Sequence, residues 1–130
     1  MKNILAIVRM DKLSETKNVL SEAGVSGFTC RRVTGRGKKV IHRALYSTLE
    51  ENGELPVSPV GEYITEGTRL IPKRLFSIIV SDGEVDKTIQ SILEVNSTGN
   101  PGDGKIFVIP MTESYRVRDG KMQTDSDYVQ

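Results

Sequence analysis

Short apolar runs in this chain alternate with two segments in which apolar residues recur every three or four positions. The runs are rich in β-branched residues and match the pattern of buried or half-buried strands. The two periodic segments match amphipathic helices. The elements predicted in this way are strands at Asn3 to Arg9, Phe28 to Val33, Leu75 to Val80 and Lys105 to Pro110, one helix from Asp11 that stops at Gly24, and a second helix from Asp82 to Val95.

The order strand, helix, strand, strand, helix, strand is that of the split β-α-β arrangement. It predicts an α+β protein with a ferredoxin-like β-α-β-β-α-β sandwich. Both helices then cover one face of an antiparallel sheet. The other face needs burial, and self-association is the simplest way to obtain it. A chain of 130 residues fits one domain, 1–130.

The stretch from Val40 to Arg69 does not fit the strand and helix pattern. It combines weak periodicity with three glycines, two prolines and scattered charge. Loops longer than about 12 to 15 residues are uncommon in compact domains unless they are functional or disordered. We therefore expect a functional excursion between the second and third strands. At the other end, Glu113 to Lys121 alternates briefly, and the polar tail 121–130 has nothing to bury.

Charge and cysteine usage exclude several classes of protein. Eighteen basic and seventeen acidic residues give a formal charge of +1, so the basic excess of a general nucleic-acid binder is missing. The single Cys30 cannot form an internal disulfide and is expected to be a packed, inert thiol. No signal peptide opens the chain, and no apolar stretch approaches the roughly 20 residues of a membrane-spanning helix. We expect a cytoplasmic protein without direct membrane insertion.

Glycines and a lysine lie directly before the predicted fourth strand, in the segment GNPGDGK from Gly99 to Lys105. Glycines let backbone N–H groups approach a phosphate closely, and the lysine adds positive charge, so the segment suits nucleotide binding. It is not a Walker A sequence, which needs GxxxxGK followed by Ser or Thr and then a helix. The alternative, an ordinary glycine-rich turn between helix and strand, stays open on composition alone.

Two further groups of cations strengthen the case for an anionic ligand. Arg116 and Arg118 are two residues apart, so we expect them on one strand face, where two guanidinium groups suit a polyphosphate. Taken alone, this pair is more typical of a solvated strand edge. The segment GRGKK, from Gly35 to Lys39, is a second cluster of glycines and cations. The three groups together favour an anion more than any one of them does.

No catalytic signature accompanies these clusters. His42, the only histidine, lies in the long excursion without acidic or cysteine neighbours at ligand spacing, and we expect it to be exposed to solvent. The chain contains no Ser/His/Asp set, no paired-carboxylate signature and no HExxH motif. The sequence therefore makes no case for an enzyme or for a metal site built from side chains.

Taken together, four segments resemble the nitrogen-regulatory P-II signalling family. The most specific is STGNPGDGKIFV, from Ser97 to Val108, followed at the family's spacing by RVRDG, from Arg116 to Gly120. Upstream, AGVSGFTCRRVTGRGKK from Ala23 and RLIPKRL around Lys73 also match. The resemblance covers nearly the whole chain apart from the long excursion.

This resemblance implies a trimer of ferredoxin-like subunits with ATP or ADP in the three clefts between neighbours. Residues expected to line the cleft around the base and ribose are Ile7, Gly27, Thr29, Gly35, Gly37 and Ile79, with Lys38 nearby. Residues expected to hold the phosphates are Gly102, Asp103, Gly104, Lys105, Arg116 and Arg118.

The resemblance also implies 2-oxoglutarate as an effector, with Lys73 matching the family lysine that pairs with its carboxylate. The second candidate, Lys39, departs from the family pattern, because many members have a glutamine there that ligates Mg²⁺ beside the nucleotide. An ammonium group cannot ligate a metal ion. Whether Mg²⁺ and 2-oxoglutarate bind to this chain is therefore left open.

The long excursion corresponds to the family's T-loop, here 36–70, which docks on partner proteins. It is longer than usual by roughly fifteen residues, well beyond the ordinary spread of loop lengths. This length resembles the subgroup from nitrogen-fixation gene clusters, whose members act on nitrogenase and assemble as a homotrimer or with a sister P-II chain. The loop residues expected to contact the partner are Arg43, Leu45, Tyr46, Leu49, Glu50, Glu51 and Tyr63.

Two alternatives accompany this hypothesis. One is a P-II regulator of an ammonium transporter or of a nitrogen-assimilation enzyme. The other comes from a different class, a small ferredoxin-like phosphoryl-transfer enzyme, which needs a catalytic group within reach of the phosphate. His42 is the only nominal candidate for that group. Stoichiometric nucleotide binding without turnover distinguishes the regulator from the enzyme.

Overall fold

A computed structural model of the chain describes residues 1–25, 27–37 and 70–128. The chain divides into a larger unit, Met1–Val33 with Pro72–Gln130, and a smaller one, Thr34–Ile71, most of which lies outside the described residues. The elements are β1 (Lys2–Arg9), α1 (Leu13–Glu22), β2 (Thr29–Gly35), β3 (Ile71–Val80), α4 (Val85–Asn96), β4 (Gly104–Pro110), β5 (Ser114–Arg116) and β6 (Lys121–Gln123), with short 3₁₀ segments at Met10–Lys12, Asp82–Glu84 and Asp125–Tyr128.

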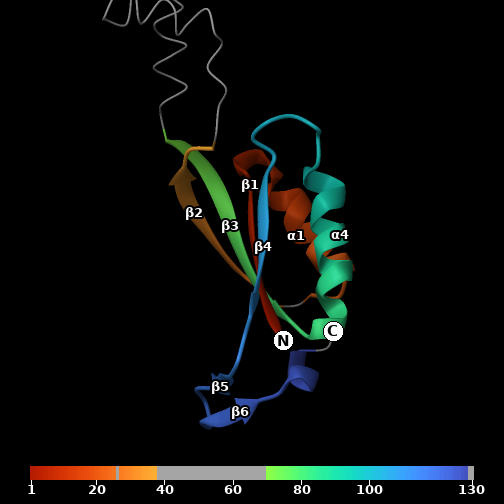
Figure 1. Cartoon of the computed structure of the whole chain (residues 1–130), viewed down its shortest axis with the longest axis vertical. Coiled ribbons are helices and arrows are strands. Elements are labelled where there is room, and N and C mark those ends of the chain that lie inside the picture. The colour runs from red at the N-terminus through yellow and green to blue at the C-terminus, as the bar shows by residue number, and fades with distance from the viewer. Residues whose placement is uncertain (26, 38–69, 129–130) are drawn as a thin grey trace, which may run out of the picture. The chain divides into compact units, whose positions relative to one another are not determined.

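The first four strands form one sheet in the order β2-β3-β1-β4, in which β1 is antiparallel to both of its neighbours (Figure 1). This order and the two helices confirm the predicted α+β, ferredoxin-like fold. β3 begins at Ile71, four residues before the predicted start at Leu75. Pro72 within this extension lies outside the register with β1, which starts at Lys73, so its missing N–H group removes no bond from that ladder.

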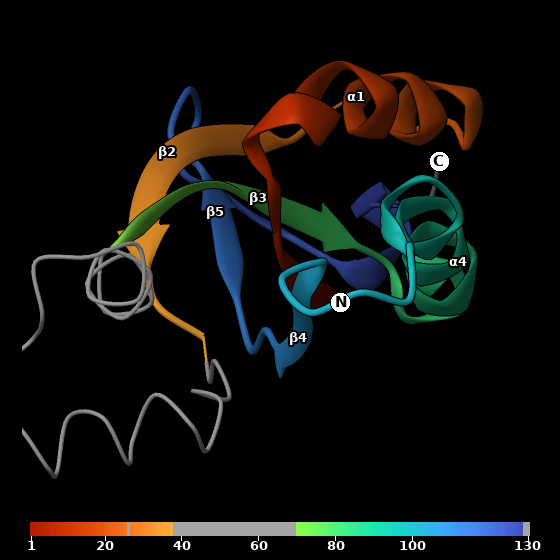
Figure 2. The same ribbon diagram turned by 90° about the horizontal axis from the view of Figure 1, so that it is seen from above.

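Both helices pack against one face of the sheet (Figures 1 and 2). Alternate residues of the central strands point into this layer, and α1 and α4 complete it. A hydrogen bond of 3.1 Å from Asn96 Nδ2 to the Thr16 hydroxyl links the two helices inside the layer. The fully buried apolar side chains of the core are Ile4, Ala6, Val8, Leu20, Val25, Phe76, Ile78, Val80 and Ile92.

The opposite face of the sheet is also apolar. Residues directly opposite each other in an antiparallel pair share a face, and Leu5 lies opposite Phe107 while Asn3 lies opposite Ile109. Phe107 is 46% exposed and Ile109 is 41% exposed. Large apolar side chains on an open sheet face favour burial against another surface. The expectation that this face needs a partner is therefore consistent with the side chains that it carries.

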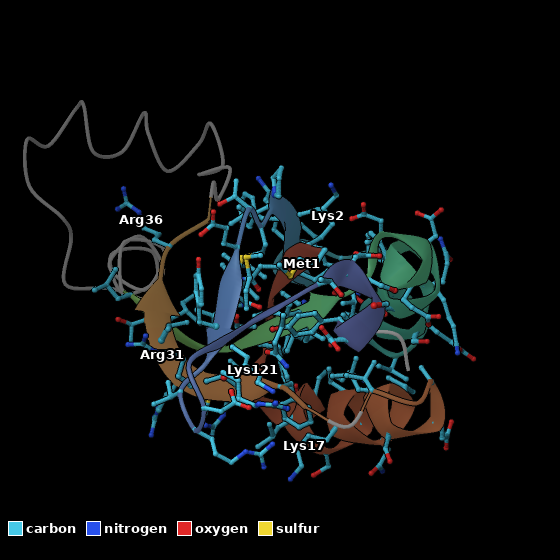
Figure 3. All side chains as sticks on the ribbon, turned by 90° about the horizontal axis from the view of Figure 1, so that it is seen from below. Met1, Lys2, Lys17, Arg31, Arg36 and Lys121 are labelled. Carbon is cyan, nitrogen blue, oxygen red and sulfur yellow. The ribbon has the colours of Figure 1, made fainter. Side chains whose placement is uncertain are left out.

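The polar segment after Lys121 contains more structure than predicted. Lys121–Gln123 forms β6 and pairs with β5, and a 3₁₀ turn at Asp125–Tyr128 follows it (Figure 3). We expected this tail to have nothing to bury, and no strand or helix was predicted in it. Polar contacts replace apolar burial here, because Asp125 Oδ1 lies 2.6 Å from the Met1 ammonium and accepts a bond of 3.0 Å from the Asp82 N–H.

No helix among residues 1–25, 27–37 and 70–128 is long and apolar enough to cross a membrane.

We predict that Gly104→Ala destabilises the sheet, because a Cβ at this position would lie 1.8 Å from the Ile7 carbonyl oxygen on β1. The φ of +121° adds strain that only glycine avoids. The free energy of unfolding should fall by about 2 to 4 kcal/mol, measured by urea unfolding. Gly83→Ala is the control, because nothing lies within 4 Å of a Cβ there. Equal stability of the two variants would contradict the close approach of β1 and β4.

Candidate functional site

The loop between α4 and β4 is built around the carboxylate of Asp103. Its Oδ2 accepts hydrogen bonds from the N–H groups of Thr98 at 2.7 Å and Gly99 at 3.0 Å, and its Oδ1 accepts one from the Thr98 hydroxyl. These donors, the Thr98 hydroxyl first, lower the pKa of Asp103 from its ordinary value of 3.8 to about 2. The carboxylate is therefore charged at neutral pH and orders the loop from inside.

Arg9, at the end of β1, ties this loop to the sheet. Its guanidinium donates to Asp103 Oδ1 at 3.3 and 3.4 Å and to the Pro101 carbonyl at 3.0 Å. The guanidinium also lies beside Gly102, where φ is +93° and a Cβ would sit 3.4 Å from Nη2 of Arg9. Sequence reasoning missed Arg9. The only signal in the sequence is a cation at the end of a predicted strand, which is too common to single out a residue.

The strand register gathers cations at this end of the open sheet face. Arg9 lies opposite Lys73 on β3, and Ile7 lies opposite Lys105 on β4. Every second residue of a strand points to the same side, so these four side chains share one face. Lys73 donates from Nζ to the Gly102 carbonyl at 2.6 Å. Arg9 and Lys73 thus donate to carbonyls of the glycine loop, the segment 97–104 that leads from α4 into β4, and Lys105 follows this loop directly in sequence.

Lys105 lines a groove of about 370 Å³ beside β4. Its ammonium lies 6.0 Å from the centroid of the Phe107 ring, and no carboxylate within the described part of the chain pairs with it. Ile89, Ile92 and Leu93 of α4 supply apolar wall, while Asp103 and Gly104 complete the polar end. The strand register, however, places the Lys105 side chain on the open sheet face with Phe107, whereas the α4 wall of the groove lies on the helix-covered face. A cation without a carboxylate partner among the described residues, beside a glycine-rich loop and an exposed aromatic ring, suits an anionic ligand.

The second group of predicted phosphate residues lies on the β5–β6 hairpin. Arg116 ends β5 and donates from Nε to both carboxylate oxygens of Asp119, at 3.1 and 3.2 Å. This hydrogen bonding raises the pKa of Arg116 and lowers the pKa of Asp119. Arg118 lies in the turn between the strands. The prediction that Arg116 and Arg118 share a strand face is therefore wrong, because the chain reverses directly after Arg116.

One chain does not bring the two groups together. The glycine loop and Lys105 lie at the start of β4, whereas the hairpin follows its far end (Figure 1). A strand of this length spans roughly 20 Å at about 3.3 Å per residue. Lys105 and Arg116 of the same chain are therefore too far apart to hold one phosphate group.

The comparisons with known proteins agree with this fold and these motifs. A family model described as "Nitrogen regulatory protein P-II" matches residues 1–121. The chain belongs to the P-II family. The family resemblance stated from the motifs is thus confirmed, and members of this family are signalling regulators.

Several relatives match almost the whole P-II chain. The protein of Methanothermobacter marburgensis named "Nitrogen fixation nifHD region GlnB-like protein 2" is 37% identical over 126 residues, 97% of this chain and 99% of its own. The protein of Methanobacterium ivanovii with the same name is 40% identical and covers 91% and 92% of the two chains. The "Nitrogen regulatory protein P-II" of Pasteurella multocida is 34% identical and covers 97% and 99%. Names that refer to a nitrogen-fixation region thus recur among the relatives.

The other predicted ligand residues of this P-II chain lie away from the loop. Ile79 is on the open face, but it pairs with Asn3 at the opposite end of β1 from Ile7. Thr29 begins β2, the edge strand farthest from β4, and Gly27 precedes it. Gly35 ends that strand, and Gly37 lies beyond it. The predicted residues Lys38, Lys39, His42, Arg43, Leu45, Tyr46, Leu49, Glu50, Glu51 and Tyr63 lie outside the described residues.

Within the described ranges, no three His, Cys, Asp or Glu side chains gather in a way that could hold a metal ion. Cys30 is a free thiol, half-buried on β2.

We predict that Thr98→Val raises the pKa of Asp103 from about 2 toward 3.8, because the Thr98 hydroxyl is the main cause of the lowered value. NMR titration of the side-chain carboxyl resonance measures this directly. Since the pKa is lower in the folded chain than in the unfolded chain, the charged carboxylate stabilises the fold above about pH 4. That contribution is lost as the pH falls through about 2. A pKa that stays near 2 in the variant would contradict the assignment.

Proposed function

We propose that this P-II chain is a non-enzymatic regulator that binds ATP or ADP in clefts between the subunits of a homotrimer. Its output passes to a partner protein through the T-loop, 36–70. The observation that carries this proposal is the separation of the cations: within one chain, Lys105 lies at the start of β4, whereas Arg116 lies beyond the far end of the same strand. A complete phosphate site therefore needs Lys105 from one copy and Arg116 from another.

The exposed apolar side chains support assembly. Phe107 and Ile109 lie on the open sheet face, and Val117 and Met122 of the hairpin are 97% and 57% exposed. A two-stranded hairpin is only marginally stable by itself. Contact between the hairpin of one copy and the sheet of the next would bury both apolar surfaces and bring the arginine to the glycine loop. A cyclic trimer repeats this contact in all three clefts.

The residues at the start of β4 fit the phosphate end of a nucleotide. Asp103 is already satisfied by loop donors and by Arg9, so its charge is compensated before a phosphate arrives. Lys105 supplies a positive charge without a carboxylate partner among the described residues. The chain would distinguish ATP from ADP through these cations, because the two nucleotides differ in the number of phosphate groups that the cations can contact.

Lys73 offers a route from the nucleotide to the T-loop. It is the third residue of β3, which follows the loop in sequence, and its ammonium donates to the Gly102 carbonyl. An anionic effector such as 2-oxoglutarate that pairs with Lys73 would compete with this bond. Binding at the glycine loop and at Lys73 is therefore energetically linked. Lys39 is the second lysine proposed to pair with such an effector. Because an ammonium group cannot ligate a metal ion, no residue is assigned to Mg²⁺ in this proposal.

Nitrogenase is the proposed partner. The support comes from the unusually long T-loop and from relatives whose names place them in nitrogen-fixation regions. A mixed assembly with a sister P-II chain is compatible with this proposal. An ammonium transporter or a nitrogen-assimilation enzyme is the alternative partner. A pull-down from nitrogen-starved cell extract, repeated with ATP, ADP and 2-oxoglutarate, distinguishes them.

The experiment that tests the sensor itself is calorimetric titration with ATP, combined with an assay for product release. Binding at one nucleotide per chain without turnover supports a regulator. Steady release of product would instead support the alternative hypothesis, a phosphoryl-transfer enzyme.

We predict that Lys105→Ala and Arg116→Ala each weaken ATP binding by roughly ten- to a hundredfold, since a hydrogen bond to a charged group contributes about 1.5 to 3 kcal/mol. Calorimetry on the folded variants measures this. Co-assembly of the two variants, carrying different affinity tags, should restore one tight cleft in each mixed trimer. That cleft combines the intact Lys105 of one copy with the intact Arg116 of its neighbour.

If the two residues served the same chain's site, every cleft of a mixed trimer would carry one defect and tight binding would not return. A stable monomer in light scattering at micromolar concentration, with ATP present, would also contradict the proposal.

We predict that replacing Ile41 to Thr68 by a short Gly/Ser linker preserves the trimer and ATP binding but abolishes inhibition of the partner. Loop-closure entropy changes by only about 0.6 kcal/mol per doubling of length, so stability should change little. Thermal unfolding, ATP titration and a nitrogenase activity assay report the three properties. Full inhibitory potency would place the output surface elsewhere, whereas failure to fold would make the excursion part of the core.

A further inference from the structure

The segment after β6 is tied to both strands of the hairpin that carries Arg116. The Tyr128 hydroxyl lies 2.7 Å from the Ser114 hydroxyl and 2.9 Å from Gln123 Oε1. An amide oxygen only accepts, so Tyr128 donates its single proton to Gln123, and Ser114 donates to the Tyr128 oxygen. Ser114 and Gln123 lie opposite each other in the hairpin. Tyr128 therefore closes the base of the hairpin.

The same segment is anchored to the main unit of the chain. The N–H of Ser81, a residue only 2% exposed, donates to the Tyr128 carbonyl at 3.3 Å. The next residue, Asp82, donates from its N–H to Asp125 Oδ1 at 3.0 Å. Both donors lie between β3 and α4. Residues 125–128 thus form a strap from the edge of the core to the base of the hairpin.

The strap influences the position of Arg116 because it is attached to the hairpin that carries this residue. Arg116 follows Ser114 by two residues and lies opposite Lys121, which precedes Gln123 by two. These four residues share one face of the hairpin. Asp119 orients the Arg116 guanidinium at the tip, whereas Tyr128 holds the base. Along the chain, only residues 111–113 connect the hairpin to β4, so the strap is a second attachment.

We propose that Tyr128 is a positioning residue for nucleotide binding: through Ser114 and Gln123 it holds the β5–β6 hairpin at the angle from which Arg116 reaches the phosphates in a neighbouring copy. This inference rests on the proposed function. A side chain that is already ordered in the free protein loses little conformational entropy when its ligand binds. Releasing the base of the hairpin should therefore weaken contacts to phosphate while contacts to the base and ribose stay unchanged.

The test compares Tyr128→Phe with Tyr115→Phe. The Tyr115 hydroxyl donates to Glu113 and has no part in the strap, so the control removes the same kind of atom from the hairpin and leaves the strap intact. Affinities for ATP and for adenosine are measured by calorimetry, adenosine by displacement. Tyr128→Phe should weaken ATP binding roughly three- to tenfold, as expected for one or two neutral hydrogen bonds. Adenosine affinity and the unfolding temperature should stay unchanged, and the control should match the parent protein.

Ser114→Ala provides a second variant at the other end of the hydrogen bond. Because both substitutions break one network, the double variant should lose less ATP affinity than the two single losses combined. Parent-like ATP affinity in Tyr128→Phe, with Arg116→Ala still defective, would overturn this inference and leave the proposed function standing. An equal loss for ATP and adenosine together with a lower unfolding temperature would also overturn it, by making Tyr128 merely structural. No ATP binding by the parent protein would instead overturn the proposed function.

Discussion

The pairing of β1 with two strands at once is the constraint on which the rest of the structure depends. Its buried side chains form the middle of the core, and its other face carries Ile7 and Arg9. Because β3 and β4 are both in register with β1, Lys73 and Lys105 arrive at the same end of the same face. The approach to β4 is so close that only glycine fits at position 104. The packing of the core and the proposed anion site thus depend on the same backbone arrangement.

In the proposed function, that arrangement supplies one half of a phosphate site. The loop before β4 is ordered by an internal carboxylate and surrounded by cations, whereas the arginines that complete the motif follow the far end of the same strand. A straight strand cannot bring its two ends together. The exposed apolar face and the exposed hairpin give a physical reason for copies of the chain to associate, and in the proposed function this association completes the site.

Short polar contacts connect the separate parts of this P-II chain. Lys73 joins the glycine loop to the strand that follows the T-loop, and Arg9 joins the same loop to the central strand. At the other end, Tyr128 joins the hairpin to the corner between β3 and α4. The Lys73 bond is exposed and the Arg9–Asp103 ion pair is partly exposed, so neither adds much to core stability. The main effect of all these contacts is on geometry, because they fix the positions of the charged side chains Arg9 and Lys73 and of the hairpin that carries Arg116.

The sequence by itself determined the four strands of the main sheet, the two helices, the ferredoxin-like fold and the family, because strand and helix periodicities and the GDGK motif are local patterns. It also placed Lys105 beside a glycine loop. Only the tertiary structure decided the role of Arg9, which meets Asp103 across 94 positions, and the part played by Tyr128 in a tail that looked structureless. The chain reversal after Arg116 was likewise decided only by the tertiary structure. Contacts between residues distant in sequence follow from the path of the whole backbone, and no local period records that path.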